Sequence, residues 1–160
     1  LWIPGETDLH RQCVENLCRL KPQCDRWGMP LMVEPIAMKP DGKGGLAVDG
    51  DPERIATLVR QAVELGADVI KADPTDDLDD FARVLRIAGG KPVLVRGGGK
   101  ASEEEIFART ERVIRAGAAG IVYGRNVIQH AKPSAITRAF MAIVHDGASA
   151  ADATKILRDA

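Results

Sequence analysis

Strand-like and helical patterns alternate along this chain of 160 residues, and the alternation limits the fold more than any other feature. Short apolar runs rich in Val, Ile, Leu or Met occur at Pro30–Ile36, Ala67–Ala72, Pro92–Arg96 and Ala118–Tyr123. They are mostly continuous, which is typical of parallel strands that are covered on both faces. The sequence therefore predicts a parallel sheet with helical crossovers, an α/β fold.

Apolar residues with a spacing of three and four predict helices between these strands. The predicted helices contain Ile55–Val63, Leu78–Leu85, Ile106–Ile114 and Ile136–Val144, and a last one follows Ser149. Ser102 and Glu105 have the spacing of a capping box, which predicts a helix start. A first helix is expected over Asp8–Leu20, with Pro22 ending or kinking it.

Two architectures satisfy this order, an open doubly wound sheet and part of a (β/α)8 TIM barrel. A complete barrel typically needs about 250 residues, and this chain holds four β/α units. The segment Leu1–Pro4 has the character of a strand end. We therefore expect residues 1–160 to be the C-terminal half of one TIM-barrel domain whose N-terminal half is absent from this sequence.

The composition argues against nucleic acid and membranes as partners. The formal net charge is -1 and aromatic residues are only 4% of the chain, so neither a basic field nor base-stacking platforms are expected. No apolar run approaches the roughly 20 residues that span a membrane. The sequence predicts a soluble, cytoplasmic protein.

Two glycine-containing loops follow the last two predicted strands. The first is Arg96-Gly97-Gly98-Gly99-Lys100 and the second is Gly124-Arg125-Asn126-Val127. Glycines let backbone amides approach an anion, and Arg125 offers a fork suited to phosphate. Each loop alone could be a plain turn or hold a surface ion pair. Together they match the loops after strands seven and eight that bind phosphate in (β/α)8 enzymes, and Arg96 could bind a second anionic group or pair with an acid.

If the last two predicted strands are strands seven and eight of a barrel, the first two are strands five and six. Lys71 then lies at the end of strand six and Glu34 at the end of strand five. A lysine removed from water loses its proton more easily and becomes a nucleophile toward carbonyl groups. Its alternative is a lysine that extends its amine to the rim. Glu34 could transfer protons or form an ion pair with a neighbouring cation. Tyr123 is expected in the core, and Lys39–Gly50 could be a lid or a mobile linker.

Three segments together resemble one family. They are Gly66–Lys71, Pro92–Lys100 and Gly117–Val127, and they resemble the archaeal-type class I fructose-bisphosphate aldolases and related deoxyribose-phosphate-type aldolases. The resemblance implies a (β/α)8 barrel, a homo-oligomer and no metal or other cofactor. It also implies Lys71 as the Schiff-base residue, with Gly97, Gly98, Gly124 and Arg125 around a substrate phosphate.

Two positions depart from the family pattern. The acid/base tyrosine of the family falls near Ile36, and the serine that often precedes the strand-seven glycines is Arg96. Glu34 is therefore the expected proton-transfer residue. The predicted function is a Schiff-base aldolase acting on a small phosphorylated keto-sugar or related carbonyl compound. A phosphate-sugar isomerase or synthase without a covalent step, and a non-catalytic phosphate-binding half-barrel, remain alternatives.

Overall fold

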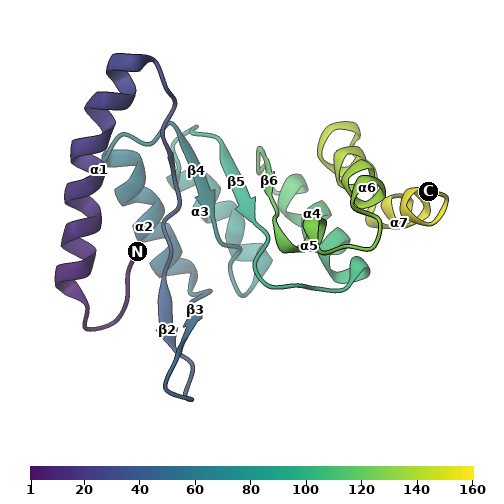
Figure 1. Ribbon diagram of the computed structural model, residues 1–160, viewed down its shortest axis with the longest axis horizontal. Coiled ribbons are helices and arrows are strands. Elements are labelled where there is room, and N and C mark those ends of the chain that lie inside the picture. Colours follow the sequence, from purple (N-terminus) through teal and green to yellow (C-terminus); the bar gives the residue numbers. More distant parts are fainter. The chain divides into compact units, whose positions relative to one another are not determined.

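The computed structural model describes residues 1–160, and the chain divides into two compact units, Leu1–Val93 and Leu94–Ala160 (Figure 1). The elements assigned to the first unit are α1 (Thr7–Trp27), β1 (Met32–Val33), β2 (Met38–Pro40), β3 (Leu46–Val48), α2 (Pro52–Glu64), β4 (Val69–Ala72), the 3-10 turn Leu78–Asp80 and α3 (Phe81–Ile87). From the unit boundary onward follow β5 (Val93–Arg96), α4 (Glu103–Arg115), β6 (Gly120–Val122), α5 (Arg125–Ile128), α6 (Pro133–Asp146) and α7 (Ala150–Arg158). The predicted alternation of helices and strands is confirmed.

The predicted parallel strands are also confirmed within each unit. β1 pairs in parallel with β4, with Met32 opposite Val69 and Val33 opposite Ile70. β5 pairs in parallel with β6 in a register that places Leu94 opposite Gly120. Outside the named strands, Trp2 makes an isolated parallel bridge to Ala37, so the expected strand character near the first residue is limited to this bridge.

A β-hairpin occupies the segment that the sequence presented as a lid or linker. β2 and β3 pair antiparallel, with Lys39 opposite Ala47. The turn between them is organised by Asp41, whose Oδ1 accepts the N–H groups of Lys43 and Gly45, both at 2.8 Å. The Asp41 N–H also donates to the Gly45 carbonyl at 3.1 Å. The sequence did not predict this hairpin, because its turn is longer than the two-residue Asn-Gly or Asp-Gly turn that marks a hairpin in a sequence.

The first helix is longer than predicted, and its expected end at Pro22 is wrong. α1 continues past Pro22 and ends at Gly28, whose φ of 62° is left-handed. Proline removes one backbone hydrogen bond from a helix. Next to the proline, Lys21 Nζ lies 2.8 Å from Asp25 and 3.1 Å from Asp68, so the helix is tied to a residue outside it at this point.

The core of the first unit lies between α2 and β4. α2 begins at Asp51, whose side chain accepts the N–H groups of Glu53 and Arg54. Its buried face consists of Ile55, Ala56, Leu58, Val59 and Ala62. Ile70 and Ala72 of β4 are also fully buried. The helical spacing read from the sequence therefore identified the core face of α2.

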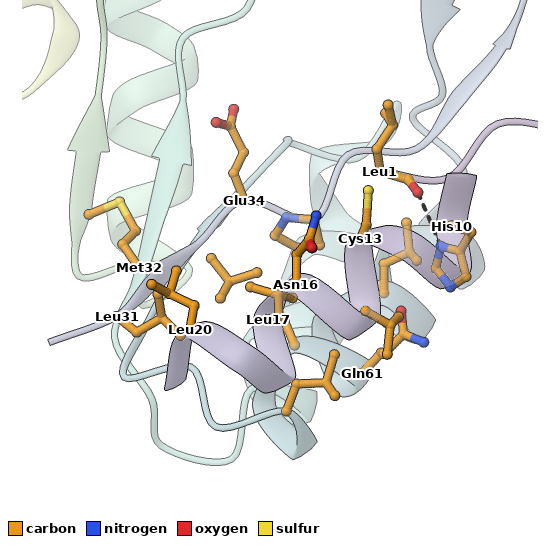
Figure 2. Close-up of a pocket in the computed structure, with 16 residues that line it drawn as sticks. Leu1, His10, Cys13, Asn16, Leu17, Leu20, Leu31, Met32, Glu34 and Gln61 are labelled. Carbon is orange, nitrogen blue, oxygen red and sulfur yellow. Dashed lines mark hydrogen bonds between the residues drawn. The ribbon is translucent and has the colours of Figure 1, made fainter. Parts of the chain in front are cut away.

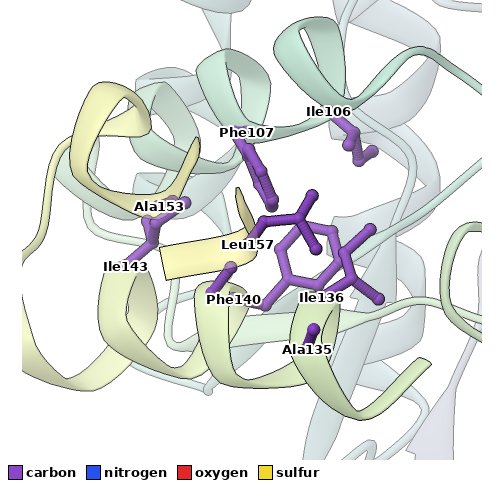
Figure 3. Packing of buried hydrophobic residues seen from close by; sticks show 9 residues of the cluster. Ile106, Phe107, Ala135, Ile136, Phe140, Ile143, Ala153 and Leu157 are labelled. Atoms are coloured by element: carbon purple, nitrogen blue, oxygen red, sulfur yellow. The ribbon is translucent and has the colours of Figure 1, made fainter. Parts of the chain in front are cut away.

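The second unit has a core of its own, made by α4, α6 and α7, which pack against one another. Figure 3 shows its cluster, in which Phe107 and Phe140 meet edge to face with ring centroids 5.2 Å apart. Tyr123 packs edge-on against Phe140, also at 5.2 Å. Its hydroxyl lies 3.0 Å from Thr110 Oγ1, so the predicted core-packing role of Tyr123 fits its contacts.

Helix starts in this unit follow the sequence closely. Ser102 and Glu105 form the predicted capping box, and Pro133 occupies the first turn of α6. None of the helices combines the length and the apolar character that a membrane span requires.

Candidate active site

Lys71 and Glu34 meet at the ends of the first unit's two parallel strands. Val33 of β1 lies opposite Ile70 of β4, so Glu34, which directly follows β1, comes beside Lys71, the next residue of β4. Side chains in register on parallel strands point to the same face. Lys71 Nζ accordingly donates a hydrogen bond of 3.0 Å to Glu34 Oε2.

The pair lies on the face of these strands opposite the α2 core. Ile70 and Ala72 are buried, and Lys71, between them, points to the other side because side chains alternate along a strand. The side chain of Lys71 is 22% exposed and that of Glu34 is 32% exposed. Glu34 was predicted either to transfer protons or to form an ion pair with a neighbouring cation. Both are compatible here, because the cation that it pairs with is Lys71, the predicted nucleophile.

The loop after Lys71 is held against the end of the hairpin. Asp76 N–H donates to the Gly50 carbonyl at 2.9 Å, and a side chain at Gly50 would collide with the Asp76 carboxylate. Lys39 of β2 lies 3.5 Å from buried Asp49 and 3.8 Å from Asp76. The hairpin base is thus tied to the segment that leaves the Lys71 strand.

An apolar groove of about 320 Å³ lies beside Glu34 in the first unit, lined by residues of α1, β1 and α2 (Figure 2). Cys13 and Leu17 of α1 and Leu31 before β1 contribute to its walls. The Glu34 carboxylate points away from the α1 side chains in this view. Glu34 therefore borders the groove with its stem and directs its charge to Lys71.

In the second unit, the predicted glycine loops contact each other. Arg125 donates from Nη2 to the Gly98 carbonyl at 2.9 Å. Asn126, which is buried, donates from Nδ2 to the carbonyls of Gly97 at 3.3 Å and Gly99 at 3.1 Å. Its Oδ1 accepts the Ala101 N–H at 3.0 Å. Gly124 directly precedes α5, and Arg96 is the last residue of β5.

Arg109 of α4 also contacts this loop, and the sequence reading missed it. Its Nη2 donates to the Gly97 carbonyl at 2.5 Å, and its guanidinium lies 5.8 Å from the Tyr123 ring centroid. Its Nε is buried without a hydrogen-bond partner. No sequence signal singles out Arg109, because it occupies an ordinary position in a charged helix.

The helix N-terminus after the glycine loop is less available to an anion than the sequence suggested. Ser102 and Glu105 hydrogen-bond to each other's backbone N–H groups at the start of α4. The bonds from Ser102 hold the pKa of Glu105 below its usual value, so its carboxylate stays charged there. Glu103 and Glu104 add further negative charge to the first turn. An anion at this loop must therefore rely on loop amides and arginines.

The sequence and the fold are similar to those of known aldolases. Residues 1–130 match the family described as DeoC/LacD family aldolase. A fructose-bisphosphate aldolase class 1 of Thermoproteus tenax is 37% identical over 140 residues, covering 86% of this chain and 51% of that protein. A 2-amino-3,7-dideoxy-D-threo-hept-6-ulosonate synthase of Halobacterium salinarum is 37% identical over 135 residues, covering 84% and 49%.

Solved structures show the same fold. An archaeal fructose-1,6-bisphosphate aldolase, with its catalytic lysine covalently bound to the carbinolamine intermediate, matches with a TM-score of 0.73 and 36% identity. That match covers 82% of this chain and 51% of the other. The chain thus spans about half the length of the relatives it matches, and its β/α units are those of a partial TIM barrel. It belongs to the DeoC/LacD aldolase family.

Proposed function

We propose that the protein is a Schiff-base aldolase that makes or breaks a C–C bond next to the carbonyl of a small phosphorylated ketone. The observation that carries this is the Lys71 amine, placed at a strand end 3.0 Å from the Glu34 carboxylate in a chain of the aldolase family. A primary amine attacks a carbonyl only when neutral, and a carboxylate in direct contact can accept its proton.

The proposed steps use only these two side chains and the substrate. Glu34 takes a proton from the Lys71 ammonium, and the neutral amine adds to the ketone to form a carbinolamine. Glu34 returns the proton to the carbinolamine hydroxyl, water leaves and an iminium forms. Glu34 then removes the proton of the substrate hydroxyl, the C–C bond breaks toward the iminium and an enamine remains. Protonation of the enamine and hydrolysis regenerate Lys71.

Two features support Glu34 as the group that moves protons. Ile36 stands where the resemblance implies a tyrosine, and an alkyl side chain exchanges no proton. Tyr123, the chain's single tyrosine, packs against Phe140 and has its hydroxyl beside Thr110 in the second unit's core. Among the residues singled out from the sequence, Glu34 is the one in hydrogen-bond contact with Lys71.

The glycine loop of the second unit would bind the substrate phosphate. Gly98 and Gly124 would supply backbone N–H groups, Arg125 a cation, and Arg96 a contact to a second anionic group. The N–H of Gly97, the other glycine predicted here, is already bonded to the Val122 carbonyl at 3.3 Å, so Gly97 would shape the loop. We further infer that residues 1–160 form the C-terminal half of one barrel domain, as the half-length match to relatives suggests.

Borohydride reduction in the presence of dihydroxyacetone phosphate tests the proposal. An iminium is reduced to a stable secondary amine, and peptide mass spectrometry then locates the adduct. We expect one adduct, on Lys71, and its loss in Lys71→Met. Lys43→Met is the matched control, because Lys43 is an exposed lysine of the same unit in the hairpin turn.

The outcomes separate the alternatives. An adduct on Lys71 that persists in Lys43→Met supports the aldolase. Binding of the phosphorylated ketone without any adduct points to an isomerase, synthase or binding module instead. Unchanged turnover in Lys71→Met rules out the Schiff-base mechanism.

A further inference from the structure

The carbonyls of three consecutive glycines in the second unit are held by three side chains from other segments. Gly97 is bound by Arg109 and Asn126, Gly98 by Arg125, and Gly99 by Asn126. In a trans peptide, the C=O of one residue and the N–H of the next point in opposite directions. The N–H groups of Gly98, Gly99 and Lys100 are therefore turned away from the side chains that hold the carbonyls.

We propose that Asn126 and Arg109 are positioning residues that turn these three amides toward a phosphate monoester. The inference rests on the proposed function and deepens it, because it names the groups that make the loop a phosphate site. Successive backbone N–H groups directed to one side form an anion-binding concavity. Asn126 and Arg109 act through the loop and do not touch the ligand in this arrangement.

The environment of Asn126 supports a structural clamp rather than a surface contact. Asn126 is only 5% exposed, and both ends of its amide are engaged, with Oδ1 on Ala101 N–H and Nδ2 on two carbonyls. An amide supplies both an acceptor and two donors, and aspartate or leucine cannot replace this combination. One side chain thus fixes both ends of the loop.

Arg109 fixes the first peptide of the loop more strongly than a neutral donor would. Hydrogen bonds from charged donors are roughly twice as strong as neutral ones. Arg109 bonds the Gly97 carbonyl, and its Nη1 would lie 3.9 Å from a side chain at Gly98. Its guanidinium lies 5.8 Å from the Tyr123 ring centroid, and its buried Nε lacks a hydrogen-bond partner. Burying an unsatisfied polar atom costs free energy. We assign Arg109 the function of holding the loop in place, which is a reason to keep an arginine at this position despite that cost.

Inorganic phosphate is the probe, because its binding does not require Lys71. Amide resonances of the protein are followed by NMR during a phosphate titration, and affinity is measured by calorimetry. We expect the largest shifts at Gly98, Gly99 and Lys100, in the wild-type protein and equally in Lys71→Met. Shifts confined to Gly124 and Arg125, or no phosphate binding, overturn the inference even if borohydride trapping succeeds.

Substitutions of Asn126 and Arg109 test whether these side chains position the glycine loop for phosphate binding. Asn126→Leu and Arg109→Met should each weaken phosphate binding about 10- to 100-fold and move the Gly98 amide resonance in the free protein. They should raise KM for a phosphorylated ketone and leave KM for unphosphorylated dihydroxyacetone within about twofold. Arg112→Met, at an exposed position of the same helix, is the control expected to match wild type.

Arg109→Lys decides the role of the guanidinium. It keeps the charge but loses the fork that reaches the Gly97 carbonyl, so we expect it to bind phosphate nearly as weakly as Arg109→Met. Full affinity in Arg109→Lys would show that charge alone matters and would overturn the positioning role. Thermal unfolding of each variant identifies those that fail to fold, and the wild-type titration decides the inference independently of them.

Discussion

Glu34 is the residue on which the proposed proton transfers depend, because its carboxylate contacts the Lys71 amine. The sequence singled out both residues at strand ends but left each with an ordinary structural alternative. Their contact depends on strand register, which apolar runs define only to within a residue or two. The residue types were therefore predictable, whereas their pairing became visible only in the structure.

Replacement of Glu34 tests its role directly. Glu34→Gln keeps the shape but removes the proton acceptor, so turnover of a phosphorylated ketone should fall about 10²- to 10⁴-fold, the usual contribution of general acid–base catalysis. The rate of borohydride-trapped adduct formation should fall with it. Glu64→Gln, an exposed change in the same unit, serves as control. Equal rates in Glu34→Gln and wild type would remove Glu34 from the mechanism.

Gly97 and Gly99 offer a matched pair within one loop. A side chain at Gly97 would lie 2.9 Å from Tyr123 Cδ1, whereas one at Gly99 meets nothing within 4 Å. Gly97→Ala should lower the free energy of unfolding by about 1–3 kcal/mol, as overpacking does, and should weaken phosphate binding. Gly99→Ala should unfold like wild type in urea. Equal stability of the two variants would show that Tyr123 moves aside at no cost.

Among the elements, the helices with a repeating apolar pattern were predicted well. The hairpin and the continuation of α1 through Pro22 were not predicted. Helical spacing and the Ser102 capping box identified α2, α4 and α6 because several residues report the same face. The hairpin depends on one aspartate and its turn, and the passage of α1 through Pro22 accompanies ion pairs to a residue far along the chain. Neither kind of contact has a periodic signature.

Asp68 links Lys21 of α1 to Leu31, the residue before β1, and its titration makes this link depend on pH. The hydrogen bond from Leu31 N–H, and then the one from Lys21, lower the pKa of Asp68. A lowered pKa in the folded state stabilises the fold above the usual aspartate range near about pH 4, and this stability is lost as pH falls through the lowered value.

We expect Asp68→Asn to unfold at a lower temperature than wild type at pH 7, and the difference to shrink below about pH 4. Circular dichroism melting at several pH values measures it. Asp25→Asn is the control, since it removes the second partner of Lys21 but leaves the Leu31 bond intact. A difference independent of pH would contradict the titration argument.

At the scale of the whole molecule, the chain has two cores rather than one. α2 and β4 bury the apolar residues of the first unit, and the cluster around Phe107 and Phe140 forms the core of the second. The sequence pattern predicted the β/α order but could not show this division, because residue spacing identifies a buried face and not the elements that cover it.

Phe140→Ala should therefore weaken the second unit selectively. Removing a buried phenylalanine typically costs about 3–5 kcal/mol. Hydrogen exchange followed by mass spectrometry should show lost protection in α4 and α6, with α2 still protected. Met141→Ala, at an exposed position beside it, should change little. Equal loss of protection in α2 would show that the two cores unfold as one.

The register of β1 against β4 has an evolutionary consequence. Because Glu34 directly follows Val33, which lies opposite Ile70, insertion or deletion of one residue in β1 would turn the carboxylate toward the apolar α2 core. Substitutions can change the identity of either partner, but only a matched length change in both strands could move the pair. Lineages that descend from such a chain should therefore vary in loop length after Pro35 far more readily than between Leu31 and Glu34.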